Sequence, residues 1–166
     1  MHVTKPRIVL SNLIAAFAGF WLASRWEIDW VLMVVTLAGS ALVMGSACAF
    51  NNVVDREMDV KMERTSRRPL AVGRLQPRFV VIYAAVLFLL GEALLFAANA
   101  LTALLGFIGF FFYVVVYTIW LKRTSTWSTS VGGVSGAMPP VIGYVAVTNE
   151  VDIGAWLLFA ILFLWQ

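Results

Sequence analysis

The sequence predicts an all-α protein, a polytopic bundle of transmembrane helices. Of its 166 residues, 61% are hydrophobic and only 13% are charged, and a mean hydropathy of +0.89 excludes an ordinary soluble domain. Apolar runs recur along the whole chain, and each is near the roughly 20 residues that cross a bilayer as a helix. We expect five complete helices and a truncated sixth, with residues 1–166 forming part of a single membrane-embedded domain.

The first two expected helices occupy the first third of the chain. One covers about residues 6–24, with Pro6 in the first turn, where its missing N–H is tolerated. The other begins near Trp30 and runs past Asn52. Small residues give this second helix a face that predicts close packing against a neighbouring helix. They are Gly39, Ser40, Ala41, Gly45, Ser46 and Ala47.

A polar segment, residues 55–78, separates these helices from the rest. The later helices are expected at about residues 79–98, 101–121 and 131–147, with a sixth beginning near Gly154. Only Asn99 and Ala100 lie between the third and the fourth, so these two should form a tight antiparallel hairpin. Glycines and the Pro139-Pro140 pair interrupt the fifth, and we expect that helix to be kinked or broken.

Basic residues are distributed unevenly between the two sides of the predicted bundle. Of the twelve, only Arg25 falls on one side; the N-terminus, the segment after the second helix and the loop after the fourth hold the others. Cytoplasmic loops of membrane proteins are enriched in Lys and Arg. We therefore expect a multi-pass protein with the N-terminus and both basic loops in the cytoplasm. The expected location is a bacterial plasma membrane. The net charge of +3 then reflects topology, and no nucleic-acid partner is expected.

Charge is concentrated in residues 51–70, at the end of the second helix. Asn51, Asp55 and Asp59 are spaced i, i+4 and i+8, so a helix places them on one face. Oxygen ligands of this kind suit Mg²⁺, which takes further ligands from substrate phosphates. A solvated loop that only sets topology has the same composition, and that interpretation stays open at this point. Glu57 lies off the shared face and is expected to be solvated or salt-bridged.

The same segment resembles the first aspartate-rich motif of the UbiA-type intramembrane prenyltransferases. The resemblance includes the Arg-Thr-x-x-Arg-Pro-Leu sequence that begins at Arg64. A second element, Tyr113-x-x-x-Tyr117-x-x-x-x-Lys122, is similar to that family's tyrosine-lysine motif. The family fold is a bundle of nine transmembrane helices. The resemblance therefore covers about the first half of this fold. It also implies a second aspartate-rich motif beyond Gln166. Without that motif, the 166 residues alone are expected to be inactive.

Four further segments resemble the branch of this family that farnesylates heme B: residues 4–7, 18–23, 121–124 and 132–143. This resemblance implies transfer of a farnesyl group from farnesyl diphosphate to a vinyl group of heme B, giving heme O for heme-copper oxidases. Association with heme A synthase or oxidase assembly factors is implied as well. The implied site residues fall into three sets. The Mg²⁺ ligands are Asn51, Asp55 and Asp59, the catalytic residues are these three with Lys122, and the substrate-binding residues are Arg64, Arg68, Tyr113, Tyr117 and Lys122.

Other functions stay open on the residues alone. A related prenyltransferase could use another aromatic acceptor, such as a quinone precursor. A transporter or channel is suggested by the interrupted fifth helix and by Glu92, a carboxylate deep in the third helix. Glu92 could equally be neutral and hydrogen-bonded in the bundle, or line a substrate cavity. A heme-binding assembly protein would need neither Mg²⁺ nor the two aspartates.

Overall fold

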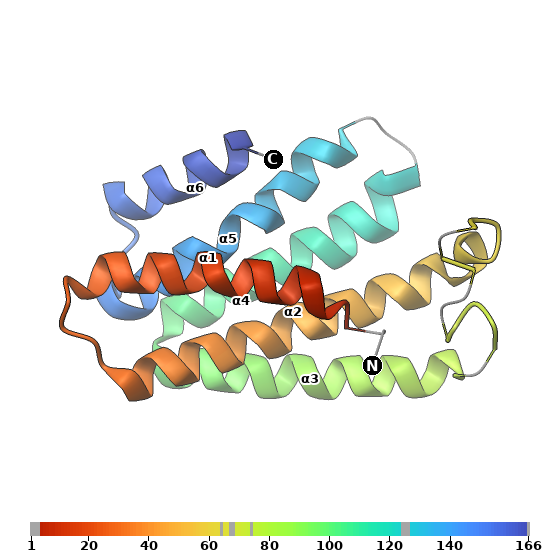
Figure 1. Ribbon diagram of the computed structural model, residues 1–166, viewed down its shortest axis with the longest axis horizontal. Helices are drawn as coiled ribbons and strands as arrows, with labels where there is room; N and C mark the ends of the chain where they lie inside the picture. Colours follow the sequence, from red (N-terminus) through yellow and green to blue (C-terminus); the bar gives the residue numbers. More distant parts are fainter. Residues whose placement is uncertain (1–3, 64, 67–68, 74, 124–126, 166) are drawn as a thin grey trace.

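The computed structural model describes residues 4–63, 65–66, 69–73, 75–123 and 127–165, apart from the side chain of Arg123. All regular structure in these residues is helical (Figure 1). The elements are α1 (Pro6–Ser24), α2 (Trp30–Asp59), α3 (Pro77–Ala98), α4 (Ala100–Phe111), η1 (Phe112–Trp120), η2 (Leu121–Arg123), α5 (Ser128–Thr148) and α6 (Ile153–Trp165). The prediction of an all-α fold is confirmed.

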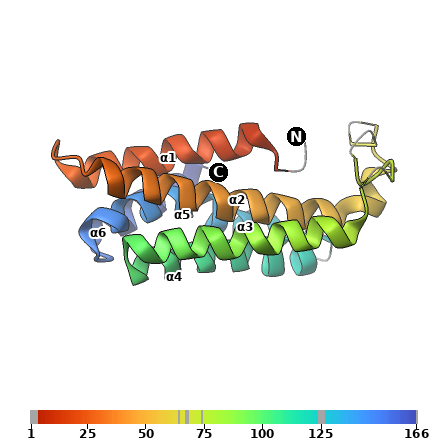
Figure 2. The same cartoon turned by 90° about the horizontal axis from the view of Figure 1, so that it is seen from below.

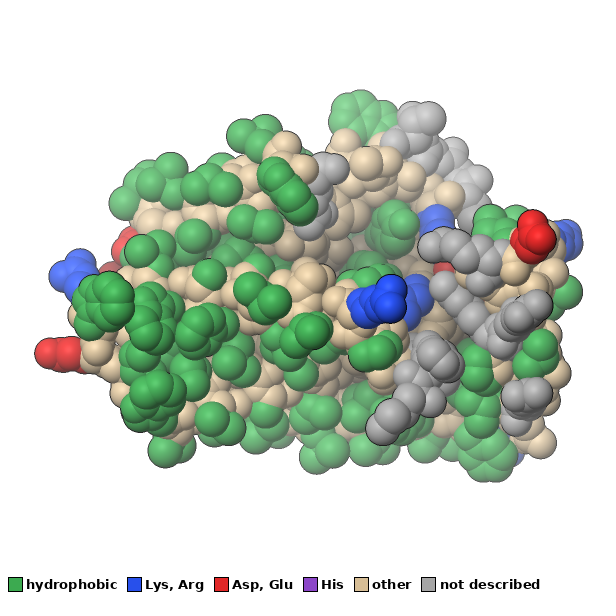
Figure 3. Space-filling view, in the orientation of Figure 1, with side chains coloured by type: hydrophobic (Ala, Val, Ile, Leu, Met, Phe, Trp, Pro, Cys, Tyr) green, Lys and Arg blue, Asp and Glu red, His purple; other side chains and the backbone are tan. Residues whose placement is uncertain are grey.

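Five helical spans in the described part of the chain are long and apolar enough to cross a membrane. They are α1, α2, α3, α4 together with η1, and α5. α6 is a shorter apolar helix. The helices run side by side along the long axis of the molecule (Figures 1 and 2). Hydrophobic side chains cover most of the visible face in Figure 3, as expected of a surface in contact with lipid. The predicted polytopic bundle is therefore confirmed.

The predicted end of the second helix differs from the structure. α2 continues to Asp59, although the sequence placed a polar segment from residue 55. The charged residues at its end therefore belong to a continuous helix.

The hairpin between α3 and α4 is confirmed, and Asn99 is its only non-helical residue. The Asn99 side chain accepts a hydrogen bond of 2.8 Å from the N–H of Thr102 and donates one of 3.1 Å to the carbonyl of Val145 in α5.

α5 is one continuous helix, so of the two expectations for it, kinked or broken, the break is wrong. Pro139 and Pro140 lie inside it and are buried. Each lacks the N–H that an α-helix interior uses. Direct packing against α1 supports this stretch: a Cβ added at Gly143 would collide with the carbonyl oxygen of Ala16, and one added at Gly19 with that of Pro140. The two backbones lie so close that the neighbouring helix holds α5 in place.

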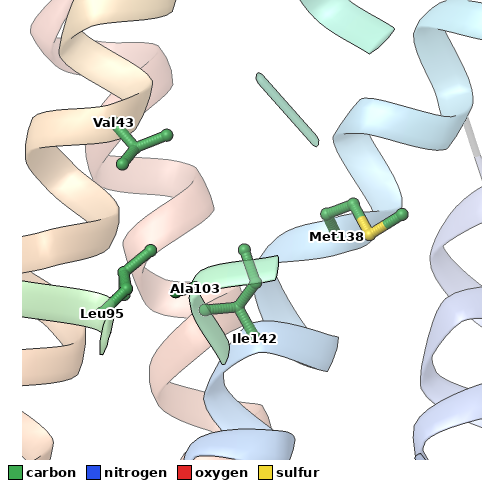
Figure 4. Close-up of a cluster of buried hydrophobic side chains, with 5 residues drawn as sticks. All are labelled: Val43, Leu95, Ala103, Met138 and Ile142. Atoms are coloured by element: carbon green, nitrogen blue, oxygen red, sulfur yellow. The ribbon is translucent and has the colours of Figure 1, made fainter. Parts of the chain in front are cut away.

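The small-residue face of α2 packs against α3, as the sequence predicts. A Cβ added at Gly39 would lie 3.0 Å from the carbonyl oxygen of Gly91. Nearer the middle of α2, the Ser46 hydroxyl donates a hydrogen bond of 2.6 Å to the carbonyl of Ala84. Four helices then meet around a buried apolar cluster (Figure 4). Its members are Val43, Leu95, Ala103, Met138 and Ile142.

Candidate active site

The last three turns of α2 carry the predicted metal-binding stripe. Asn51, Asp55 and Asp59 are 2%, 7% and 4% exposed. Glu57 projects elsewhere: it is exposed and lies 3.5 Å from Arg56, as predicted for a salt-bridged residue. A helix C-terminus is the negative end of the helix dipole and disfavours carboxylates. Burial disfavours their charge further, so the two aspartates require a cation close by.

One such cation comes from another helical segment. Lys122, in η2, donates a hydrogen bond from its Nζ to Oδ2 of Asp55. The same Nζ lies 5.9 Å from the centroid of the Tyr117 ring, within cation–π range. The Tyr113 and Tyr117 rings are 5.7 Å apart. The structure therefore brings together the aspartate stripe and the tyrosine-lysine element, which are about 60 residues apart in the sequence.

A second lysine reaches the stripe from the N-terminus. Lys5 immediately precedes α1, with φ of 47° and ψ of 64°, and its Nζ donates a hydrogen bond of 2.5 Å to Oδ1 of Asn51. In the sequence, Lys5 indicated only the topology and a family resemblance, so its contact with Asn51 was not predicted. A signal was present, because Lys5 lies in one of the segments that resemble the prenyltransferase family.

η1 is a π-helical segment, which the sequence did not predict. Thr118, fully buried within it, donates a hydrogen bond of 2.7 Å from its hydroxyl to the carbonyl of Tyr113. The same hydroxyl oxygen accepts a bond of 3.3 Å from Nδ2 of Asn51. Asn51 is thus held between Lys5 and Thr118. No pattern in the sequence distinguished Thr118 from a residue that only packs.

The segment after α2 is described in part. Thr65 is buried, and its hydroxyl donates a hydrogen bond of 3.2 Å to the carbonyl of Asp59, which folds the chain back over the end of α2. Arg64 and Arg68, which the family resemblance implies as substrate-binding residues, lie outside the described residues.

The side chains of the stripe fit a magnesium ion chemically. Within the described ranges, no group of three or more His, Cys, Asp or Glu side chains is close enough to hold a metal. Mg²⁺, however, needs only one or two carboxylates when phosphate and water supply the other ligands. Ammonium groups contact oxygens of Asn51 and Asp55, so these positions already attract positive charge. An amide oxygen and two buried carboxylates form a hard-oxygen donor set.

An apolar cavity of about 270 Å³ begins one helical turn from this stripe. Ala47 and Cys48 of α2 line it, and Ala47 lies four positions before Asn51, a rise of about 6 Å along the helix. The cavity extends between α1, α2, α4 and α5 as far as Ser40. Tyr113 lines this cavity and also a second one of about 320 Å³ beside α5. A charged cluster and an apolar channel thus adjoin, which suits a ligand with an anionic head and a hydrocarbon tail.

Glu92 lies near the far end of this cavity. A Cβ added at the cavity-lining Gly106 would come within 3.1 Å of Oε1 of Glu92. That oxygen is buried and has no hydrogen-bond partner in the part of the chain that the structure describes. Of the two roles considered for Glu92, a place beside the cavity is the one that agrees with this geometry.

Comparison with known proteins places the chain among relatives of one kind. Residues 12–166 match the UbiA prenyltransferase family. Protoheme IX farnesyltransferases from Cronobacter sakazakii, Yersinia pseudotuberculosis and Escherichia coli are each 50% identical to the chain over 167 residues. The alignments cover 100% of this chain and 57%, 57% and 56% of those proteins, so the chain spans little more than half the length of these curated relatives.

Solved structures share the fold. A digeranylgeranylglyceryl phosphate synthase superposes with a TM-score of 0.85 at 20% identity, covering 98% of this chain and 56% of that one. A UbiA homologue from Aeropyrum pernix K1 has a TM-score of 0.81 at 22% identity, with coverage of 99% and 61%. A UbiA homologue from Archaeoglobus fulgidus, solved with GPP and Mg²⁺, has a TM-score of 0.78 at 19% identity, with coverage of 98% and 59%.

Proposed function

Since the chain belongs to the UbiA prenyltransferase family, we propose that it forms part of a Mg²⁺-dependent membrane enzyme that transfers a farnesyl group from farnesyl diphosphate to a vinyl group of heme B, giving heme O. One observation carries the reaction type: two buried carboxylates, one of them paired with Lys122, follow on α2 the residues that line an apolar cavity. The 50% identity to protoheme IX farnesyltransferases supports heme B as the acceptor. The Archaeoglobus homologue bound to GPP and Mg²⁺ supports a prenyl diphosphate donor.

The diphosphate binds at the end of α2. Asn51, Asp55 and Asp59 hold Mg²⁺, and the metal supplies positive charge that stabilises the departing diphosphate. Lys5 and Lys122, which contact this donor set directly, turn their ammonium groups to the diphosphate oxygens. Arg64 and Arg68 provide further cationic contacts to the same anion.

The hydrocarbon tail lies in the cavity between α1, α2, α4 and α5. Its apolar walls exclude water from the reacting carbon, so the preorganised charges near the leaving group act in a medium of low dielectric constant. Tyr113 and Tyr117 face the head of the tail, and their rings stabilise the positive charge that develops on the allylic carbon.

Transfer begins at C1 of the farnesyl chain. The bond between the farnesyl C1 and the diphosphate oxygen breaks, and pyrophosphate leaves with the electron pair. The vinyl group of heme B attacks C1 through its terminal carbon, which forms a carbon–carbon bond and leaves a cation next to the porphyrin ring. A water molecule adds to that cation and loses one proton, giving the hydroxyethylfarnesyl side chain. Heme B, farnesyl diphosphate and water thus give heme O, pyrophosphate and a proton.

The setting of this reaction is also part of the proposal. Residues 1–166 form part of one membrane-embedded domain, with the ends of α2 and η1 at the cytoplasmic face, because the basic residues gather there. The enzyme lies in the bacterial plasma membrane. Its product passes to heme A synthase or to oxidase assembly factors.

The test is a product assay on the full-length protein in membranes. Heme B and farnesyl diphosphate are supplied with and without Mg²⁺, and the pigments are identified by mass. We expect heme O only with Mg²⁺, and none from Asp55→Ala or Asp59→Ala. Heme O from both variants would refute the site assignment. Prenylation of a hydroxybenzoate with heme B untouched would refute the acceptor.

A further inference from the structure

The side-chain amide of Asn51 can lie in two orientations that differ by a flip, and only one of them offers an oxygen to a cation. With Oδ1 toward the site the group is a ligand; with Nδ2 toward the site it presents two N–H donors, which repel a metal or an ammonium group. In the structure Oδ1 faces the Nζ of Lys5, and Nδ2 faces Thr118. The neighbours of the amide therefore decide whether Asn51 can bind a cation.

Thr118 determines the orientation of the Asn51 amide, because the Thr118 hydroxyl has a single proton to donate. The hydroxyl donates that proton to the carbonyl of Tyr113, at 2.7 Å. Only lone pairs remain on the Thr118 oxygen, so toward Asn51 it acts as an acceptor. It can accept from Nδ2, as it does at 3.3 Å, but it has nothing to donate to Oδ1. Thr118 is 0% exposed, so within the protein no bulk solvent competes for these bonds.

The π-helical geometry of η1 makes this arrangement possible. A π-helix pairs residues that are five apart, and Thr118 is five residues after Tyr113. The wider turn brings the Thr118 side chain onto the Tyr113 carbonyl and leaves its oxygen aimed at α2. Such π-helical turns occur frequently at functional sites, and this one has a defined consequence for Asn51.

We propose that Thr118 is a positioning residue, which fixes the Asn51 amide with its oxygen toward the divalent metal and its nitrogen toward η1. The inference rests on the proposed function in that it takes Asn51 as a metal ligand. It assigns Thr118 an effect on metal affinity, exerted through the Tyr113 carbonyl and Asn51, with no contact between Thr118 and the metal or the substrate.

Direct metal binding tests this proposal without requiring turnover. The full-length protein in lipid nanodiscs is titrated with Mn²⁺ in the presence of inorganic pyrophosphate, and free Mn²⁺ is measured by electron paramagnetic resonance. Thr118→Val keeps the shape of the side chain and removes the hydroxyl, whereas Thr118→Ser keeps the hydroxyl. Loss of an outer-sphere hydrogen bond of this kind predicts a roughly 10-fold weaker Mn²⁺ affinity for the valine variant and a change within about twofold for the serine variant.

A double-mutant cycle separates positioning from packing. If Thr118 acts through the amide, Thr118→Val adds nothing to the loss of affinity already caused by Asn51→Ala. Equal weakening by valine and serine, wild-type affinity in the valine variant, additive losses in the double variant, or no Mn²⁺ binding by the wild type would each overturn the proposal. Failure of the proposed function has a different result: the wild type binds Mn²⁺ but makes no heme O, and the valine and serine variants still differ.

Discussion

Replacing Lys122 with methionine removes the ammonium partner of a buried carboxylate and keeps most of the apolar stem. The Asp55 side chain is 9% exposed and that of Lys122 is 33% exposed. Breaking a fully buried pair costs about 3–5 kcal/mol, while an exposed pair contributes about 0–1 kcal/mol. Because water reaches Lys122 in part, we expect a loss of about 2 kcal/mol in the free energy of unfolding, a roughly 30-fold change in the folding equilibrium.

The assay is equilibrium unfolding of the full-length protein in mixed micelles titrated with SDS, followed by circular dichroism and without Mg²⁺. The double variant Asp55→Asn, Lys122→Met removes both charges, so most of the lost stability should return. Heme O production should stay absent, because Asp55 is also the proposed metal ligand. Lys61→Met, at an exposed lysine, is the control and should lie within about 0.5 kcal/mol of the wild type.

Either of two results would contradict this role of the Lys122 charge. In one, Lys122→Met unfolds with wild-type free energy, which means that water or another group replaces the ammonium at no cost. In the other, the double variant stays as unstable as the single one, which means that the Lys122 side chain stabilises the fold by packing and that its charge contributes little.

Three further outcomes are expected. Gly143→Ala should lower the free energy of unfolding by about 1–3 kcal/mol, since the new Cβ meets the backbone of α1. The control is Gly45→Ala, whose Cβ has its nearest neighbour at 3.6 Å. This variant should unfold like the wild type in the same SDS titration. Chelation with EDTA should abolish heme O production and excess Mg²⁺ should restore it; an unchanged rate of pigment formation would exclude a metal requirement. The N–H of Ala155 donates to the Asp152 carboxylate and holds its pKa below the ordinary value of 3.8, with a further bond from Tyr144. This contribution to stability is therefore present above pH 3.8 and is lost as the pH falls through the lower, folded pKa. Asp152→Asn should show a smaller loss of stability between neutral pH and pH 3, and an identical loss would contradict this role.

The helices were predictable because their signals are local. Apolar run length gave the spans, and Pro6 and Asn99 marked a start and a junction that the structure retains. The spacing of Asn51, Asp55 and Asp59 was sufficient to place them on one face. The prediction of a break in α5 was wrong because it considered only the backbone N–H groups that Pro139 and Pro140 lack. It could not include the contact with α1, which depends on residues more than 100 positions away.

The remaining site residues were not predictable from pattern. The π-helical turn of η1 has no sequence signature comparable to a helix cap, and Thr118 gains its role only from that turn and from Asn51 of another helix. Lys5 was visible as a charge, but its contact with Asn51 depends on the left-handed backbone at the start of α1. Both examples arise from pairs of residues far apart in the chain, for which a single sequence holds no direct evidence.

The partnership of Asp55 and Lys122 also has a consequence for biosynthesis. The ribosome adds Asp55 67 residues before Lys122. At roughly 5–20 residues per second, this leaves the carboxylate without that lysine for about 3–13 seconds. During this interval water must solvate the Asp55 carboxylate. The end of α2 therefore stays at the membrane surface while α3, α4 and η1 are inserted. Lys5, synthesised before α2, is available throughout. The Asp55–Lys122 pair can therefore form only after α1, α2, α3, α4 and η1 have been synthesised, and can do so before α5 follows.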